Sequence, residues 1–551
     1  MSNASSSDTM SVGTAAEMLP KDRLAGLKEN WKSDIVSGFI LFLIALPLSL
    51  AIAIASGAPP MAGLFAAIIG GIVVSQLSGS YVTINGPAAG LIVVIVGAVE
   101  RLGGGAAGYH CACAAIAVSG VLLLIAGLCR AGALGYFVPA TVVHGMLAAI
   151  GFIIIAKQIP VLLGIAAPSK EPLMLFAKIP EMISHLNPEI ALIGFVGLAI
   201  VIIYNLIKVP LLKKVPAPII VVTVGVLMGI AFQVGTAHSY TFNNHEYLID
   251  PKKILVVLPP SMMDAVTAPD WSKVATSAFW YSVVAITLIQ GVETLLSCAA
   301  VDKLDPYKRT ADLSRDVAAV GVGTALSGMI GGIPMIAEIV RSTANVANGA
   351  KTRWSNFFHG SFILIFVLIG AALIDMIPQA CLAALLIMVG YRLASPKEFI
   401  HTYEIGPEQL LLYATTIIAV LATDLLVGVG IGIALKIVLH FINGAPFSLN
   451  WFIAKAKTEQ EGDTYTVNVE GVSIFSNFLS LKRQLDKVPP GKKLLVNMSK
   501  VRLIDHSSMD HLSQFKRNYE KTGGTMELTG LSEHKAASKH ALSSRKLVKI
   551  G

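Results

Sequence analysis

The chain has 551 residues and a formal net charge of +8; 54% of its residues are hydrophobic and only 14% are charged. Soluble domains usually carry about 25% charged residues, so this composition excludes a purely soluble protein. From Ile35 to Val99 there is not one Asp, Glu, Lys or Arg. A bilayer core imposes such a pattern, because each spanning helix needs about 20 apolar residues.

The first 33 residues are expected to form a cytoplasmic segment. Residues 1–20 are rich in Ser, Thr and Ala, a composition typical of disorder. Residues 21–33 place Leu24, Leu27 and Trp31 on one helical face among Lys and Arg, which predicts a short interfacial helix. No small-residue cleavage pattern precedes the first span, so that span is expected to remain in the mature protein.

Fourteen apolar segments follow, several of them short. They lie near residues 35–56, 61–77, 87–99, 111–129, 136–156, 189–207, 217–234, 274–299, 316–330, 335–347, 357–376, 379–393, 410–423 and 425–442, with a Pro-punctuated interfacial stretch at 159–180. An even number of spans keeps both termini on one side. Lys28 and Lys32 before the first span, with Lys455 and Lys457 after the last, favour cytoplasmic termini. The sequence thus predicts a transmembrane transport domain over 34–445 in the cell inner (plasma) membrane.

Two small-residue stretches interrupt the spans, SGSYVTINGP at 78–87 and SGMIGGIP at 327–334. Each ends in Pro, which suits the first turn of a helix because its missing N–H costs nothing there. Non-helical backbone at membrane depth is tolerated only where it lines a cavity. A pair of such interrupted spans, one in each half, indicates an inverted-repeat transporter site. Two ordinary kinked spans are the alternative interpretation.

Two half-helices whose N-termini converge would form an anion site, because helix N-termini carry partial positive charge and free N–H donors. The backbone is expected to bind the anion, so few polar side chains are needed. The predicted residues are Ile84, Asn85, Gly86, Ala88 and Ala89 in the first half, and Ile333, Met335, Ile336 and Ala337 in the second.

Ionisable residues inside predicted spans are energetically expensive and mark functional sites. Glu293 lies in mid-span beside Thr294, with Ser297 one turn further on. A carboxylate here can take up a proton, or bind a cation together with the two hydroxyls. The alternative is a structural partner for a Lys or Arg elsewhere.

Other polar residues in or near the spans have simpler interpretations. Glu338 and Arg341 are three residues apart in the second half-helix; they either pair with each other or leave Arg341 to add positive charge near the anion. His144 is expected to be a packed core histidine rather than a proton relay, and Asp424 a turn or capping residue. The cysteines lie in or beside apolar segments without ligand partners, so they are interpreted as apolar fillers, with no metal or disulfide expected: Cys111, Cys113, Cys129, Cys298 and Cys381.

From about residue 30 onward the chain resembles the SulP (sulfate permease) family of anion transporters. The resemblance is carried by ALPLSLAIAIASGAPPMAGL (45–64), NGPAAG (85–90), GVETLLS (291–297) and GGIPMIAEIVRSTANVANGAKTR (331–353). It implies an all-α polytopic membrane protein whose fourteen spans form a seven-plus-seven inverted repeat. Spans 1–4 and 8–11 would form a core, and spans 5–7 and 12–14 a gate, usually in a homodimer. The anion would lie between spans 3 and 10, lined by spans 1 and 8.

The resemblance also implies roles for individual residues. Glu293 falls where cyanobacterial bicarbonate transporters of the family carry an Asp that helps to bind sodium, and Ser297 falls where they carry a Thr. Arg341 falls on the family's arginine at the anion site. The resemblance therefore implies a sodium ion bound at Glu293 and Ser297, and no other cofactor is expected.

The first span departs from the family pattern. Leu48 and Ser49 replace a Gln-Gly pair that follows the first-span proline, and Ile52 replaces an aromatic residue. These three residues are expected to line the substrate pocket, and their low polarity disfavours sulfate. The segments LPLSLAIAIASG and EIVRSTAN are similar to those of family members found near or fused to carbonic anhydrases. This association favours bicarbonate as the transported anion.

The tail over 452–551 resembles a small cytoplasmic α/β STAS domain. Strands are predicted at YTVNVEG, KLLVNMS and TMELTGL, with helices around FLSLKRQL and after IDHSSMDHL. Ser507 or Ser508 is expected to cap the second helix. Phosphorylation of either is the alternative role, although Met509 replaces the Gly that the family usually carries.

The sequence therefore predicts a secondary active transporter of small inorganic anions, bicarbonate first among them, coupled to sodium or protons through Glu293. Its core is expected to move against the gate like an elevator. A sulfate or dicarboxylate transporter, a passive exchanger or channel, and a nucleobase symporter are the alternatives. The sequence contains no pattern of a catalytic nucleophile with its base, so an enzyme is not expected. The basic tail lacks the aromatic interleaving of a nucleic-acid binder, so the expected partners are the anion, the lipid bilayer and a second copy of the chain.

Overall fold

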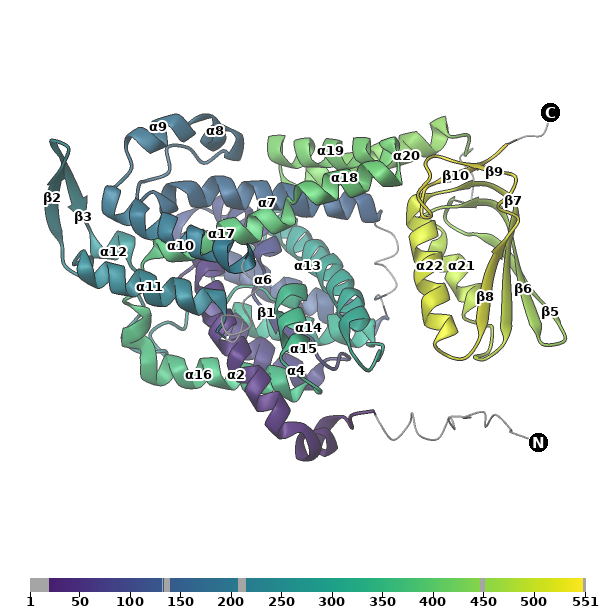
Figure 1. Ribbon diagram of the computed structural model, residues 1–551, viewed down its shortest axis with the longest axis horizontal. Coiled ribbons are helices and arrows are strands. Elements are labelled where there is room, and N and C mark those ends of the chain that lie inside the picture. The colour runs from purple at the N-terminus through teal and green to yellow at the C-terminus, as the bar shows by residue number, and fades with distance from the viewer. Residues whose placement is uncertain (1–18, 131, 133–138, 207–214, 446–450, 549–551) are drawn as a thin grey trace, which may run out of the picture.

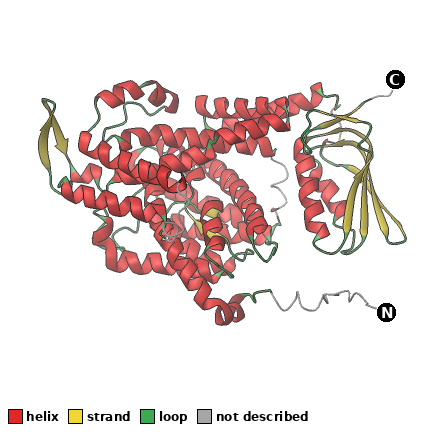
Figure 2. Cartoon of the chain, in the orientation of Figure 1, coloured by secondary structure: helices red, strands yellow, loops and turns green. Residues whose placement is uncertain are grey.

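A computed structural model describes residues 19–130, 132, 139–206, 215–445 and 451–548. The predictions for residues 1–18 lie outside these ranges. A large helical bundle is followed by a smaller α/β domain beside it (Figures 1 and 2). The hairpin of β2 (His238–Phe242) and β3 (His245–Ile249) lies at the end of the bundle opposite to the α/β domain (Figure 1).

Within the described ranges, nine helices are long and apolar enough to cross a membrane. Two shorter apolar helices and three short helices bring the spanning elements to the predicted fourteen. In chain order they are α2 (Arg23–Ala55), α3 (Pro60–Ile69) continued by η1 (Gly70–Val74) and α4 (Ser75–Leu77), α5 (Ile92–Arg101), α6 (Gly105–Leu128), α7 (Ala140–Leu162), α10 (Pro188–Leu206), α11 (Ala217–Ala231), α13 (Ser277–Leu304), α14 (Leu313–Met329), α15 (Ile339–Ala347), α16 (Trp354–Ile374), α17 (Gln379–Leu393), α19 (Pro407–Ala422) and α20 (Leu425–Ile442).

The spans pack as two groups that repeat one pattern. In the first group α6 packs against α13 and α14, and α16 packs in the equivalent way against α2 and against α3 with η1. In the second group α7 packs along α17, with α19 beside α7 and α10 beside α17. These groups correspond to the expected core and gate, and the repeated packing is that of an inverted repeat.

Small residues allow the closest helix pair in the core to form. A Cβ added at Gly120 of α6 would lie 2.3 Å from the backbone N of Ala325, and one added at Gly321 of α14 would lie 2.4 Å from the N of Leu124. Spanning helices rely on such close backbone approach, because lipid supplies no hydrophobic drive for their association. A larger side chain at either glycine would force α6 and α14 apart.

The predicted separate interfacial helix at 21–33 is wrong. The helix α2 runs without a break from Arg23 to Ala55, since no helix-breaking residue lies between the basic segment and the first span. Asp34, within α2, accepts hydrogen bonds from the backbone N atoms of Lys351 (2.8 Å) and Thr352 (3.2 Å), which fixes the start of α2 against the entry to α16.

Short elements connect the spans. The stretch near 159–180 ends α7 and then forms α8 (Pro172–Ala177), followed by α9 (Ile179–Ser184), both too short to span a membrane. The remaining connecting helices are η2 (Ala89–Leu91), α12 (Pro251–Ile254) and α18 (Pro396–Ile405).

The C-terminal domain has a six-stranded sheet with two helices on the side that faces the bundle (Figure 1). The three predicted strands and both predicted helices are present: β6 (Thr464–Ser473), α21 (Phe478–Leu485), β7 (Lys493–Ile504), α22 (His506–Glu520) and β8 (Thr525–Thr529). β7 lies between β6 and β8 and is parallel to both.

Three further strands of this domain were not predicted from the sequence. β5 (Lys455–Glu461) pairs antiparallel with β6, and β10 (Arg545–Leu547) joins β7 to β9 (His534–Ala536). β5 reads KAKTEQE and is exposed along most of its length. A polar strand at a sheet edge carries no apolar alternation for a pattern search to find.

Candidate anion site at the paired strands

The two interrupted spans meet inside the helical bundle. Ile84–Gly86 form β1 and Ile336–Glu338 form β4, and the two strands pair antiparallel with Asn85 opposite Ala337. All three β1 residues are buried. The pair thus joins the third span to the tenth, as the sequence led us to expect, and α13 packs directly against β4 and η2.

The predicted start of each half-helix at its proline is wrong. After Pro87 the chain stays extended through Ala88 (φ −114°, ψ 144°), and a short turn at η2 leads into α5 at Ile92. Pro334 precedes β4, and α15 begins only at Ile339. Strand pairing satisfies backbone groups that a helix beginning at either proline would leave without partners.

The residues whose backbone was predicted to bind the anion therefore lie in two different places. One set lies in the strand pair: Ile84, Asn85, Gly86, Ile336 and Ala337. The other set lies at the turn before α5 or on the approach to β4: Ala88, Ala89, Ile333 and Met335. In the second set, the N of Ile333 donates to the O of Ala62 (3.3 Å), and the O of Met335 accepts from the Gln290 side chain (2.6 Å).

Glu293 lies against η2, the short turn that leads into α5. A Cβ added at Gly90 would lie 2.0 Å from Glu293 Oε1, so only glycine leaves room for the carboxylate here. Glu293 is 5% exposed, and its Oε1 has no hydrogen-bond partner among the described residues. The neighbouring Thr294 hydroxyl is likewise buried without a partner in the described ranges. Buried polar atoms without partners are costly, which points to a ligand at this position.

Arg341 is completely buried between the two halves of the molecule. Its Nε lies 3.2 Å from Glu338 Oε2, and its Nη2 donates to the O of Pro87 (3.3 Å). Its Nη1 faces Gly86, and this nitrogen has no partner in the part of the chain that the structure describes. Both expected roles are therefore compatible: the i,i+3 ion pair forms, and one guanidinium nitrogen remains available beside β1. Glu338, however, is the cap residue that precedes α15 rather than a residue within the helix.

The charges at the site do not balance. Glu293 and Glu338 lie close enough to interact electrostatically, and Arg341 is the cation between the two halves. His359 of α16 is buried near Arg341, and neither of its ring nitrogens has a described hydrogen-bond partner. With a neutral imidazole and both carboxylates ionised, this cluster carries a formal charge of −1.

The first-span residues are buried or half-buried, and they make no hydrogen bond to the strand pair among the described residues. Leu48 is half-buried, whereas Ser49 and Ile52 are 0% and 3% exposed. The carbonyl O of Ser49 packs against Gly63 of α3, and its hydroxyl has no described partner. Ser297 is buried four residues after Glu293, on the same face of α13.

Comparison with known proteins identifies the family of the chain. Residues 31–416 match the profile of the Sulfate permease family, and residues 455–549 match that of the STAS domain. The chain belongs to the sulfate permease family. It is therefore a multi-pass membrane protein that transports small anions, and it is not an enzyme.

Similar sulfate permeases differ in the anion that their names give. A candidate sulfate transporter of Bacillus subtilis, YvdB, is 24% identical over 525 residues, covering 91% of this chain and 92% of YvdB. The bicarbonate transporter BicA of Picosynechococcus is 26% identical over 428 residues, covering 74% of this chain and 70% of BicA. These relatives establish anion transport without fixing the substrate.

Solved structures share the fold of this sulfate permease. The transmembrane domain of a cyanobacterial BicA aligns with a TM-score of 0.63 at 22% identity, covering 73% of this chain and 98% of that one. Murine Slc26a9 in the inward-facing state aligns with a TM-score of 0.66 at 15% identity, covering 96% and 90%. The second alignment extends over the transport domain and the STAS domain.

Several polar residues of the site were not predicted from the sequence. Gln290, one turn before Glu293, donates to the O of Met335 and to the Thr324 hydroxyl. The Ser342 hydroxyl accepts from the N of Ile84 (2.9 Å), and Asn356 donates to Asn85 Oδ1 (3.1 Å). Each is a polar residue in an apolar span, so the rule that selected Glu293 would have found them if applied to uncharged side chains.

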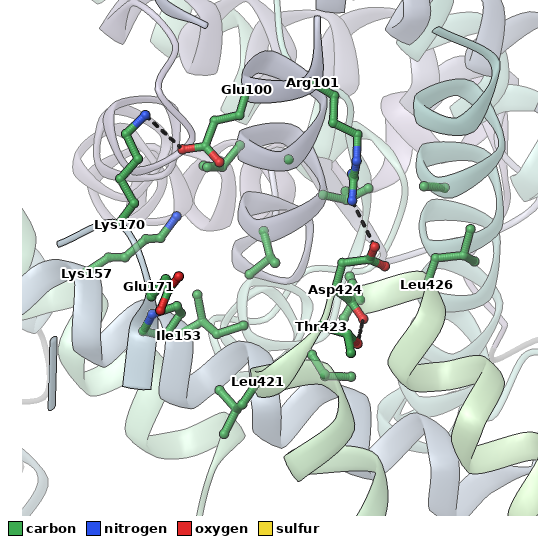
Figure 3. A pocket seen from close by; sticks show the side chains of 18 of the residues that line it. Glu100, Arg101, Ile153, Lys157, Lys170, Glu171, Leu421, Thr423, Asp424 and Leu426 are labelled. Carbon is green, nitrogen blue, oxygen red and sulfur yellow. Dashed lines mark hydrogen bonds and ion pairs between the residues drawn. The ribbon is translucent and has the colours of Figure 1, made fainter. Parts of the chain in front are cut away.

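A cavity of about 290 Å³ opens between core and gate (Figure 3). The core helix α5 contributes Arg101, whose Nη2 lies 2.9 Å from Asp424 Oδ2 at the turn between α19 and α20. Asp424 also caps α20 by accepting from the N of Val427, which confirms its predicted capping role. Lys157 and Lys170 line the same cavity.

Two other predictions are wrong. His144 is exposed at the start of α7, 3.6 Å from Glu398 Oε2, because its position faces away from the packed side of that helix. In the STAS domain the cap of α22 is Asp505, which accepts from the N of Ser508 (2.7 Å). Ser507 and Ser508 instead lie in the first helical turn and are 1% and 0% exposed, so neither is accessible to a kinase in this arrangement.

None of the five cysteines forms a disulfide bond in the structure. Cys111, Cys113, Cys298 and Cys381 are buried and free, whereas Cys129 is exposed. Among the described residues, no group of three or more His, Cys, Asp or Glu side chains could hold a metal ion. A sodium ion at Glu293 would therefore depend on hydroxyl and carbonyl oxygens besides the single carboxylate.

Proposed function

We propose that this sulfate permease is a secondary active transporter of small inorganic anions, with bicarbonate as the anion and sodium or protons as the coupling ion. The charge of the buried cluster supports coupling. Glu293, Glu338 and Arg341 together carry −1, and a second negative charge in so buried a place would be strongly repelled. A sodium ion or a proton at Glu293 would bring the cluster to neutrality and allow an anion to bind near Arg341.

The oxygen atoms around Glu293 fit either coupling ion. The Oε1 of Glu293 and the Thr294 hydroxyl, both without a partner among the described residues, are oxygen donors of the kind that sodium takes. Ser297 supplies another hydroxyl one turn further on. A proton on Glu293 would neutralise it without any further ligand. The lack of a structural cation at Glu293 among the described residues argues against the passive alternative, in which Glu293 only holds the fold together.

The balance of charge also favours bicarbonate over sulfate. With one coupling cation bound, a monoanion would leave the buried cluster at −1, whereas sulfate would leave it at −2. Arg341 already shares its charge with Glu338, and Ser49 is the only polar side chain among the three expected first-span residues. The similarity to BicA, a bicarbonate transporter, agrees with this choice.

The orientation and assembly of the protein are part of the proposal. Both termini would be cytoplasmic in the plasma membrane, since fourteen spans keep them on one side and the flanking segments are basic. Transport would take place as the core slides against the gate, with a homodimer as the working unit. Cross-linking in native membranes, with accessibility labelling of the single exposed cysteine, Cys129, would test assembly and sidedness.

Uptake by purified protein in liposomes tests the transport proposal. Radiolabelled bicarbonate, sulfate and fumarate are offered under three conditions: an inward sodium gradient, an inward proton gradient, and neither. We expect bicarbonate uptake that one of the two gradients drives and that Glu293→Gln uncouples. Glu246→Gln, in the exposed β2–β3 hairpin, is the control and should behave like the wild type.

The same experiment discriminates the alternatives. Uptake that ignores both gradients, and that Glu293→Gln leaves unchanged, would identify a passive exchanger. Uptake of sulfate or fumarate in preference to bicarbonate would retain coupled transport but replace the substrate.

A further inference from the structure

A cavity of about 720 Å³ lies between the transport core and the STAS domain. One wall is formed by the end of α13, the loop after it and the start of α14. The other wall is formed by α21 and α22, the helices that face the bundle (Figure 1). The volume lies within the range of about 300–1,000 Å³ that is typical of small-ligand sites.

The cavity is lined by more cations than anions. Its basic side chains are Lys303, Lys308, Lys482, Arg517 and Lys521, and its acidic ones are Asp302 and Asp486.

Of the two acids, Asp486 is already paired with Lys482 (2.6 Å), and Asp302 accepts a hydrogen bond from the N of Ala311 (2.9 Å). The other four basic side chains, two on the core side and two on the STAS side, make no ion pair within 4 Å of a carboxylate of the described residues, although Lys521 attracts Asp302 at longer range. Like charges facing one another across a cavity repel, and an anion between them would turn this repulsion into attraction.

We propose that this cavity binds a phosphate-bearing anion that bridges the core and the STAS domain. Lys303 and Lys308 of the core would contact it from one side, and Arg517 and Lys521 of α22 from the other. Phosphate oxygens accept charge-assisted hydrogen bonds from guanidinium and ammonium groups, and these are among the strongest polar contacts in proteins. The phosphate can belong to a free polyphosphate-type anion or to a lipid headgroup, because the cavity adjoins the ends of spanning helices.

Binding at this place would restrain transport, a consequence that rests on the proposed function. The STAS domain is fixed to α20 of the gate through Asp505, whereas Lys303 and Lys308 belong to the core. An anion that holds Arg517 and Lys521 to these lysines would therefore tie the core to the gate. We expect the bound form to transport more slowly than the free form.

Binding itself is measured first, so that its result is independent of any transport assay. The full-length protein in nanodiscs of neutral lipid is titrated with inorganic pyrophosphate at constant ionic strength, and binding is followed by calorimetry. We expect saturable binding that Arg517→Gln/Lys521→Gln weakens by about tenfold or more, since two charge-assisted contacts are lost. Lys516→Gln is the matched control, because Lys516 lies on the same helix, pairs with Glu520 and does not line the cavity.

Misfolding of the double variant is tested without ligand. Arg517 and Lys521 are exposed, and their removal relieves repulsion by the core lysines but also removes the attraction of Lys521 for Asp302, so the midpoint of thermal unfolding should stay close to that of the wild type. Nanodiscs that contain anionic phospholipid identify the source of the phosphate: competition with pyrophosphate indicates a headgroup, and its absence a free anion. No saturable binding to the wild type, or equal binding by the double variant and Lys516→Gln, would overturn the proposal.

Discussion

His440 Nε2, near the end of α20, lies 3.2 Å from Asp505 Oδ2 at the start of α22, and both side chains are almost completely buried. Lys436, one turn earlier on α20, places its Nζ 3.9 Å from the same oxygen. Asp505 also accepts from the backbone N atoms of Ser508 (2.7 Å) and Phe475 (3.1 Å). One carboxylate therefore caps a STAS helix and holds the last gate helix.

We expect Asp505→Asn to loosen the STAS domain from α20. Asparagine can still cap α22, but Lys436 would then be buried without a counter-charge. Breaking a buried ion pair in this way costs about 3–5 kcal/mol. Urea unfolding of the detergent-solubilised protein, followed by tryptophan fluorescence because Trp451 lies against His440, would measure the loss.

Asp463→Asn is the control for that experiment. Asp463 belongs to the same domain and pairs with Lys492, but its side chain is 87% exposed. Exposed pairs contribute about 0–1 kcal/mol, so this variant should unfold like the wild type. Equal unfolding by Asp505→Asn and Asp463→Asn would contradict the proposed anchoring role of Asp505.

The same contact predicts a pH dependence with a definite sign. Burial by itself would raise the pKa of Asp505, but the charge of Lys436, the contact with His440 and the hydrogen bond from Ser508 hold that pKa well below its ordinary value. A carboxyl whose pKa is lower in the folded state stabilises that state fully above its unfolded pKa of about 3.9. The contribution is lost as the pH falls below that value towards the folded pKa. Unfolding free energies measured from pH 7 to pH 3 should show a decline below about pH 4 that Asp505→Asn removes.

Gly90→Ala should disable the site at Glu293 without unfolding the protein. The added methyl carbon would lie 2.0 Å from Glu293 Oε1, a distance that no relaxed structure keeps, so the carboxylate must move. We expect uptake in liposomes to fall by about tenfold or more, since a displacement of about 1 Å at a site can cost up to about a hundredfold. Gly430→Ala on α20 is the control, because its methyl would meet no atom within 4 Å.

A second-site change makes the Gly90 prediction specific. Aspartate is one methylene shorter than glutamate, so Glu293→Asp should make room for the methyl group of Gly90→Ala. The double variant is expected to transport better than Gly90→Ala alone. Equal loss in the single and double variants would show that the methyl group damages something other than the position of the carboxylate.

The sequence allowed the interrupted spans to be recognised, but not where their helices begin. Pro87 and Pro334 are both suited to a first helical turn, and nothing local forbids it. The helices start later because β1 pairs with β4, a partner about 250 residues away in the chain. A long-range backbone pairing of three residues on each side leaves no local pattern, so it became visible only in the folded structure.

The cap of α22 shows a related limit. Asp505, Ser507 and Ser508 are all residue types that cap helices well, so composition alone does not choose among them. The choice follows from burial: a helix that starts after Asp505 turns Met509 and Leu512 into the STAS core. It also leaves the carboxylate where Lys436 and His440 arrive from another domain, a contact that only tertiary structure reveals.

The Arg101–Asp424 ion pair predicts a change in transport rate rather than in stability. The ion pair joins the core helix α5 to a turn of the gate (Figure 3). Tyr281 of the core supports the pair, because its hydroxyl donates to Asp424 Oδ1 (2.8 Å) and its ring lies 4.4 Å from the Arg101 guanidinium. The two charged side chains are 35% and 30% exposed, so the pair contributes at most about 1 kcal/mol. Because the pair must break whenever the core moves away from this turn, Asp424→Asn should lower that barrier and raise the maximal uptake rate by up to about fivefold.

Charge reversal tests whether the pair itself is responsible. Arg101→Glu/Asp424→Arg would restore attraction with the signs exchanged, so its rate should return towards the wild-type value while Arg101→Glu alone remains fast. Since the pair is partly exposed, the difference between wild type and Asp424→Asn should shrink at high salt, where the Debye length falls to about 3 Å at 1 M. A rate that Asp424→Asn leaves unchanged at low salt would mean that core and gate part elsewhere first, and that this contact only follows the motion.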